Sequence, residues 1–96
     1  MSEERAFVEN WWTRKFSMPN LPTDDDVIMV SHALELLKAF RWSGDAKWMT
    51  GPNEKSFLEA WWLRKFPDNP LKWGSVLRLA DAEELLIEFR KSTQAT

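Results

Sequence analysis

The sequence contains one histidine, His32, and neither cysteine nor tyrosine, so it has few groups that could catalyse a reaction. A serine hydrolase would need this histidine beside a nucleophilic serine and an acid. His32 falls on the polar side of an expected helix, and no glycine-rich turn is present to expose a serine. We therefore expect a protein that is not an enzyme, with His32 facing solvent.

Carboxylates recur at matching positions, with Glu9 matching Glu59 and Glu35 matching Glu84. Four inward glutamates in a helical bundle can hold two metal ions, but such centres also use Glu-x-x-His motifs. The one comparable spacing, from His32 to Glu35, has the reverse order, and Glu35 points away from the expected core. The three glycines form no phosphate-binding loop. We expect neither a metal nor another cofactor.

Two nearly identical segments combine tryptophan with arginine and lysine. "FVENWWTRKF" at 7–16 and "FLEAWWLRKF" at 57–66 agree at seven of ten positions. Aromatic rings and cations together can bind single-stranded nucleic acid, by base stacking and phosphate neutralisation. The candidate residues for that alternative are Arg14, Lys15, Arg64 and Lys65. A net charge of -2 argues against it, and cations in the last turn of a helix also complement its dipole.

A second pair of segments shows that the chain is a tandem duplication. "ALELLKAFRWS" at 33–43 and "AEELLIEFRKS" at 82–92 agree at seven of eleven positions. The first pair of segments is offset by 50 residues and the second pair by 49. We interpret residues 1–96 as a single domain with repeat units at 2–43 and 52–92, joined by a turn-rich linker at 44–51.

Each unit is predicted to be a helix, a loop and a second helix. The first helix is expected at 2–16, where Ser2 serves as N-cap and the prolines of "SMPNLP" end it. The second is expected at 23–42, with Thr23 and Asp26 at the spacing of a capping box. The third is expected at 53–66. For residues 75–80 two alternatives stay open: a helix spanning 75–92, or an extended "SVLRL" before a helix capped by Asp81.

Helical periodicity of about 100° per residue indicates which residues face the core. Those expected to be buried are Phe7, Val8, Trp11, Trp12, Phe16, Met29, Val30, Ala33, Leu34, Leu36, Leu37, Phe40, Ala82, Leu85, Leu86 and Phe89. The third helix, with Ala60 and Leu63, is apolar almost all round. It should lie centrally or carry a partner or homo-oligomer surface at residues 57–63. The predicted fold is all-α: two tandem helix-loop-helix repeats packed as a pseudo-twofold four-helix domain.

Three tryptophans fall outside the core pattern: Trp42, on the outward side of the second helix with Ile28, Trp48 in the linker, and Trp73 in a loop. Exposed tryptophan and arginine dominate the energetics of protein interfaces. We therefore take Trp42, Trp48 and Trp73 as candidate protein-binding residues. The matching arginines of the two units, Arg41 and Arg90, are candidate rim partners.

The segments "SEERAFVENWW" and "NEKSFLEAWW" resemble small accessory proteins of tailed phages and prophages, over about ten residues per unit. The resemblance implies an accessory, host-directed binding protein, such as an inhibitor or regulator of a host protein. The sequence therefore predicts a small non-enzymatic protein–protein interaction module, with nucleic-acid binding and a structural homo-oligomer as alternatives.

The location and partner follow from composition. The acidic start "MSEERAFVEN" is unlike a secretory signal, and the longest apolar run, "VIMV", is too short to cross a membrane. We expect a cytoplasmic protein without membrane contact, whose partner is another protein.

Overall fold

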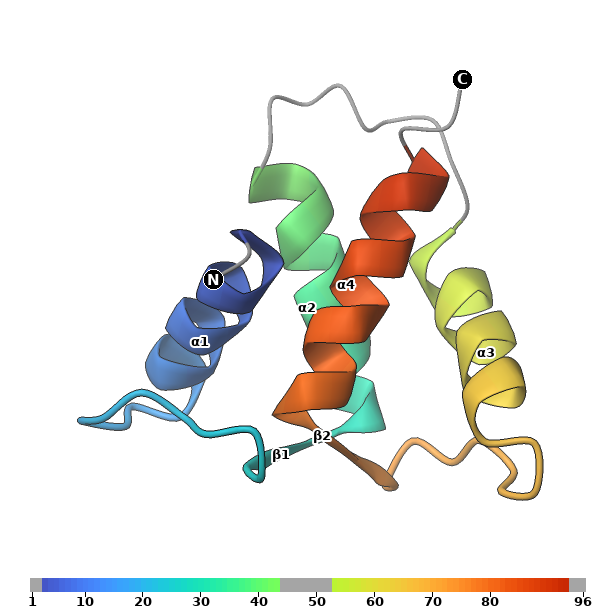
Figure 1. Ribbon diagram of the computed structural model, residues 1–96, viewed down its shortest axis with the longest axis horizontal. Coiled ribbons are helices and arrows are strands. Elements are labelled where there is room, and N and C mark those ends of the chain that lie inside the picture. Colours follow the sequence, from blue (N-terminus) through green and yellow to red (C-terminus); the bar gives the residue numbers. More distant parts are fainter. Residues whose placement is uncertain (1–2, 44–52, 94–96) are drawn as a thin grey trace.

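The computed structural model describes residues 3–43 and 53–93, which form four helices and two short strands. In chain order these are α1 (Glu3–Lys15), β1 (Val27–Met29), α2 (Val30–Ser43), α3 (Glu54–Lys65), β2 (Val76–Arg78) and α4 (Leu79–Thr93). In Figure 1, α2 and α4 occupy the middle, α1 and α3 flank them, and the strands lie together at one end. The expected linker at 44–51 lies outside the described residues.

The four expected helices are confirmed, but the two strands correct the prediction of an all-α fold. β1 and β2 pair antiparallel as a small ribbon. The opposed residues are Ile28 with Leu77 at the centre, and Val27 with Arg78 and Met29 with Val76 on either side. Because Leu77 follows Ile28 by 49 positions, the offset of the second repeated segment, the ribbon pairs a residue with its own copy.

The start of the second helix is the clearest error of the sequence interpretation. Thr23 and Asp26 do bond as expected: the Thr23 N–H donates to Asp26 Oδ2 at 2.7 Å, and the Asp26 N–H donates to the Thr23 carbonyl at 3.2 Å. These bonds close a turn instead of starting a helix, and α2 begins only at Val30. The intervening residues extend because they hydrogen-bond to the other strand, which outweighs local helix propensity.

In the second unit, the extended alternative for "SVLRL" is confirmed. Its helix begins at Leu79, ahead of the expected cap Asp81. The strand and helix therefore join directly in both units. The backbone hydrogen bonds across the ribbon also match: the Val30 N–H donates to the Ser75 carbonyl at 2.7 Å, and the Leu79 N–H donates to the Asp26 carbonyl at 2.9 Å.

The two units are packed into each other. α1 contacts α4 and α3 contacts α2, in addition to the contacts that each makes with the second helix of its own unit. Aromatic contacts repeat with the sequence: Phe7 meets Phe40 edge-on, and Phe57 meets Phe89 in the same way, each with 5.1 Å between ring centroids. The described chain is therefore one mostly helical body with a pseudo-repeat.

Most of the predicted core is confirmed. Buried as expected are Val8, Trp12, Val30, Ala33, Leu36, Leu37, Phe40, Ala82, Leu85, Leu86 and Phe89, and partly buried are Phe7, Trp11, Phe16 and Leu34. Two neighbouring residues contradict the prediction: Ile28, expected outside, is 2% exposed, and Met29, expected in the core, is 40% exposed. A strand turns successive side chains to opposite faces, which reverses the helical assignment.

The expected central position of the third helix is wrong. α3 lies at one side of the molecule (Figure 1), and its Leu63 is 64% exposed. Its buried face consists of Phe57, Leu58, Trp61 and Trp62. α3 packs against the other helices through that face alone, so its other apolar residues, Ala60 and Leu63, are exposed to solvent.

The strand assignment predicts opposite mutational costs at two adjacent positions. Ile28→Ala should lower the free energy of unfolding by about 2–4 kcal/mol, because it opens a cavity in the core. Met29→Ala should cost less, about 1 kcal/mol, because its side chain is 40% exposed and lies on the outer face of the ribbon. Urea unfolding followed by tryptophan fluorescence measures both. A larger loss of stability for Met29→Ala than for Ile28→Ala would contradict the strand assignment and favour one continuous helix over these residues.

Candidate functional site

Two of the three candidate tryptophans, Trp42 and Trp73, lie far apart. Trp42 lies in the last turn of α2 and is 62% exposed, whereas the carbonyl of Trp73 accepts a hydrogen bond from the N–H of Ser31 at the start of α2. Eleven residues of helix separate these points, or roughly 16 Å. Trp48 lies outside the described residues. Trp42 is therefore an isolated exposed ring within the described part of the chain.

Trp73 holds a loop against a helix. It is 38% exposed, and the Nζ of Lys55 lies 5.7 Å from its ring centroid. The corresponding residues of the first unit, Asp24 and Arg5, form an ion pair. Burial alone would lower the pKa of Arg5, but its hydrogen bonds to Glu9 and Asp24 outweigh this and raise it. The second unit thus replaces an ion pair with a cation–π contact at the same place.

Arg41 connects the two units. Its Nη1 donates to Glu54 Oε2 at 2.6 Å, and both side chains are largely buried. Its guanidinium also lies over the ring of Phe89, 5.0 Å from the centroid. Arg41 therefore joins the end of α2 to the start of α3 and contacts α4. These contacts within the chain occupy the group that the sequence interpretation placed on a binding rim.

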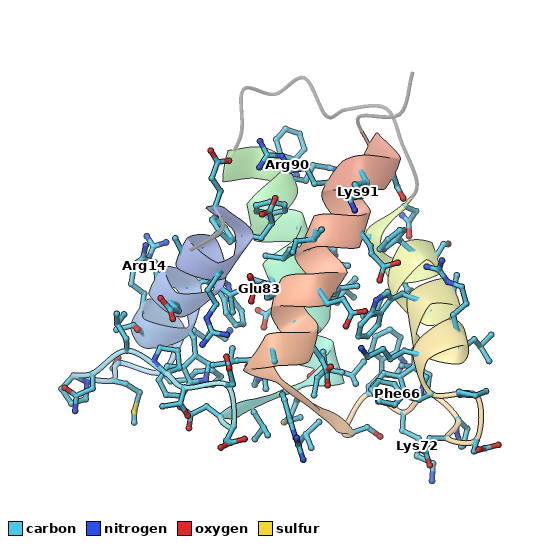
Figure 2. The ribbon with its side chains drawn as sticks, in the orientation of Figure 1. Arg14, Phe66, Lys72, Glu83, Arg90 and Lys91 are labelled. Atoms are coloured by element: carbon cyan, nitrogen blue, oxygen red, sulfur yellow. The ribbon has the colours of Figure 1, made fainter. Side chains whose placement is uncertain are left out.

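Arg90 makes the corresponding connection from the second unit to the first. Its Nη1 donates to Glu3 at 2.7 Å and to Glu4 at 3.0 Å, which joins the end of α4 to the start of α1. The hydrogen bonds to Glu3 and then to Glu4 raise the pKa of Arg90. In Figure 2 Arg90 lies at the end of the molecule opposite the ribbon.

The residues of the nucleic-acid alternative are mostly engaged within the chain. The Nζ of Lys15 donates to Glu35 Oε1 at 3.0 Å. The Nζ of Lys65 donates to Glu84 and forms a second ion pair with Asp81 Oδ1 at 3.4 Å. Arg64 lies 3.8 Å from Glu88, while Arg14 is exposed and points away from the body (Figure 2). The neighbouring rings of Trp12, Trp61 and Trp62 are buried. Base stacking needs an open ring face, which these three do not offer.

The outward face of the ribbon is a feature that the sequence interpretation missed. While Ile28 and Leu77 point into the core, the opposite face carries Val27, Met29, Val76 and Arg78, which we call the ribbon face. Val27 is 48% exposed and Val76 is 54% exposed. The alternation of side chains in "VIM" and "VLR" predicts this face when both segments are strands.

A shallow pocket adjoins this face. It has a volume of about 310 Å³ and lies between the end of α3 and the loop that leads to β2. Its lining residues are Trp62, Phe66, Asn69, Pro70, Lys72, Ser75 and Val76. The indole Nε1 of Trp62 donates to the Asn69 carbonyl at 2.8 Å, which holds the loop in place. Val76 belongs to both the pocket and the ribbon face.

Comparison with family models, with curated proteins and with solved structures finds no match for this chain. Across residues 3–43 and 53–93, no three His, Cys, Asp or Glu side chains converge as metal ligands would. The expectation that His32 faces solvent is wrong, because its ring packs edge-on against Phe16, 5.4 Å between centroids, which leaves it half-buried. In the same residues no helix has the length and hydropathy needed to cross a membrane.

The ion pairs of Lys65 predict a pH dependence. Its hydrogen bond to Glu84 outweighs burial and, with the charge of Asp81, raises the pKa of Lys65 above the ordinary 10.5. A raised folded-state pKa stabilises the fold below the ordinary value, and this stabilisation is lost as the pH rises through the raised value. Lys65→Met should therefore be less stable than the wild type at neutral pH, by about 0.5–1 kcal/mol.

The difference should disappear in alkali above the raised pKa of Lys65. Urea unfolding of both proteins across this range measures it, with Lys38→Met as the control, because Lys38 is exposed and forms no ion pair in the described part of the chain. A difference that stays constant into alkali would mean that Lys65 acts through packing instead of charge.

Proposed function

We propose that the chain is a non-enzymatic protein-binding module and that its binding surface is the ribbon face. One observation carries this proposal. Of the eight large hydrophobic side chains that are exposed in the described residues, six lie on the ribbon or on the two loops that lead into it. They are Met18, Leu21, Val27, Met29, Trp73 and Val76.

An apolar outer face is unusual for a two-stranded ribbon. Antiparallel sheets with one face on the core commonly place polar side chains on the other. Here Ile28 and Leu77 make the ribbon's contacts with the core, and Val27, Met29 and Val76 are left 48%, 40% and 54% exposed. Apolar groups gathered in this way mark interaction sites.

The size of the ribbon face favours a short segment as its partner. Three apolar side chains that are about half exposed and one exposed arginine cannot supply the roughly 800 Å² per partner of a standard interface between folded proteins. An extended or helical peptide segment needs less, because it docks through a few anchoring side chains. A regulator or inhibitor of a host protein, which the phage resemblance implies, would recognise such a segment.

We also infer that the two units are related by a pseudo-twofold axis through the ribbon centre. The copies Ile28 and Leu77 face each other there, and Arg41 and Arg90 reach across between units in matching ways. The same relation makes the ribbon face a joint product of both units. Neither unit alone would present it.

A homo-oligomer is the second candidate, and the outer face of α3 favours it. Ala60 and Leu63 are exposed there, although the rest of the expected surface at residues 57–63 is largely turned inward. Two apolar residues make a smaller contact than the ribbon face. If this surface drives assembly, Leu63→Glu should dissociate the oligomer, as measured by light scattering of the eluted protein.

The proposal predicts that binding follows the ribbon face. The tagged protein is used to retain partners from bacterial lysate after nuclease treatment, and retained proteins are identified by mass spectrometry. The double variant Met29→Ser/Val76→Ser should lose them, because it removes apolar contact without disturbing Ile28 or Leu77. The matched control Ala60→Ser/Leu63→Ser changes α3 and should keep them.

Two results would contradict this function. Partners that bind both double variants equally do not use the ribbon face. Material that is retained only without nuclease would favour the nucleic-acid alternative, and Arg14→Ala/Arg64→Ala should then abolish retention. Circular dichroism of each variant shows whether its fold is intact.

A further inference from the structure

The ribbon face and the pocket form one continuous surface, joined at Val76. Residues two apart on a strand share a face, so Val76 and Arg78 point the same way from β2, about 7 Å apart along the strand. Lys72 lines the pocket on the other side of Val76. Figure 2 shows Phe66 and Lys72 close together at the ribbon end of the molecule, with Lys72 directed outward. The surface thus has an apolar centre between two cations.

Both cations are available to a ligand. Lys72 and Arg78 are exposed, and neither forms an ion pair with any residue in 3–43 or 53–93. This contrasts with Lys65, Arg41 and Arg90, which are engaged within the chain. Unpaired cations beside an apolar surface are ready to bind carboxylates of a partner, and such charges govern specificity and association rate.

The first unit lacks this combination. The positions that correspond to Lys72 and Ser75, 49 residues earlier, hold Thr23 and Asp26. A cation is therefore replaced by a neutral residue, and a hydroxyl by a carboxylate. Arg78 lies opposite Val27, one position from Asp26, whereas Lys72 lies beyond the other end of β2. An acidic ligand would therefore be held most strongly at the Lys72 end, away from Asp26.

We propose that this surface, which comprises the ribbon face and the pocket, binds an acidic peptide segment that carries one bulky apolar side chain. This inference rests on the proposed function and names its ligand. The apolar side chain docks in the shallow pocket against Phe66 and Val76. Carboxylates on either side of it pair with Lys72 and Arg78.

The dimensions of the pocket agree with a single anchoring side chain. Its volume of about 310 Å³ is at the lower limit of ligand pockets, which span roughly 300–1,000 Å³. Phe66, Pro70 and Val76 provide accessible apolar lining, whereas the Trp62 ring is only 4% exposed. Such a site suits the ring or branched side chain of one residue, in the manner of the anchor residues that dominate peptide recognition.

Nuclear magnetic resonance provides the direct test on the full chain. The probe is an acetylated decapeptide with four Asp or Glu residues around one central Phe. Two matched peptides replace the Phe with Ala, or the acids with Lys. The indole N–H of Trp62, assigned from its loss in Trp62→Phe, reports binding because Trp62 and Asn69 both line the pocket and this N–H donates to the Asn69 carbonyl.

We expect the acidic Phe peptide to shift the Trp62 indole resonance, and both matched peptides to bind at least tenfold more weakly. The double variant Lys72→Glu/Arg78→Glu should also lower the affinity for the acidic peptide by at least tenfold. Lys38→Glu/Lys91→Glu gives the same change in net charge away from the ribbon end and should alter binding less than about twofold at physiological salt. Equal binding of the acidic and basic peptides would overturn the inference. So would a shift caused by a single-stranded oligonucleotide but not by the acidic peptide.

An unbiased peptide display library separates failure of this inference from failure of the proposed function. It is selected on the wild-type protein and depleted on Met29→Ser/Val76→Ser. Enrichment of sequences with acids around a bulky apolar residue supports both claims. Enrichment of neutral or basic sequences contradicts the acidic ligand and leaves the ribbon face as a binding surface. If no sequence depends on the ribbon face, both claims are wrong.

Discussion

The pairing of β1 with β2 is the interaction on which the rest of the described structure depends. Ile28 and Leu77 bring the two repeat units together at one end, and each strand continues directly into a central helix, α2 or α4. The antiparallel register therefore sets how these helices lie beside each other. Once they are placed, α1 and α3 can pack on the helices of both units, and Arg41 and Arg90 can reach the opposite unit.

This constraint also produces the proposed binding surface. A strand alternates its side chains, so burying Ile28 and Leu77 necessarily turns their neighbours outward. A polar residue at each outward position would have made the ribbon purely structural. Instead Val27, Met29 and Val76 are apolar, and Arg78 is the one charged member. The proposed function and its proposed acidic ligand both follow from these four side chains and the adjoining pocket.

Local periodicity predicted much of the fold, because the helices bury apolar residues at helical spacing. Val8, Trp12, Leu36 and Leu86 are examples that the structure confirms. The strands escaped prediction in the first unit because "VIMV" also suits the start of an amphipathic helix. What makes it extended is its partner, 49 residues away in the chain, and local propensity contains no information about that distance. The extended alternative for "SVLRL", applied to its counterpart "VIMV", predicts β1 as well.

The candidate site was less predictable, because exposure and pairing are properties of three-dimensional neighbours. Arg41 has the composition of an interface residue, yet Glu54 and Phe89 surround it. Trp73 lies outside the helical pattern, yet Lys55 and the start of α2 hold it in place. Conversely, Met29 was expected in the core from a helical pattern and lies on the surface because its segment is a strand.

A designed disulfide tests the ribbon and its register most directly, because the chain has no cysteine of its own. The hydrogen bonds at Val30–Ser75 and Asp26–Leu79 make Met29 and Val76 a non-hydrogen-bonded pair, with Cα atoms about 4.5 Å apart. Met29→Cys/Val76→Cys should oxidise to an intramolecular disulfide. Val27→Cys/Val76→Cys is diagonal in this register, at about 7–8 Å, and should not. Equal cross-linking of both variants, or disulfides only between molecules, would contradict the account.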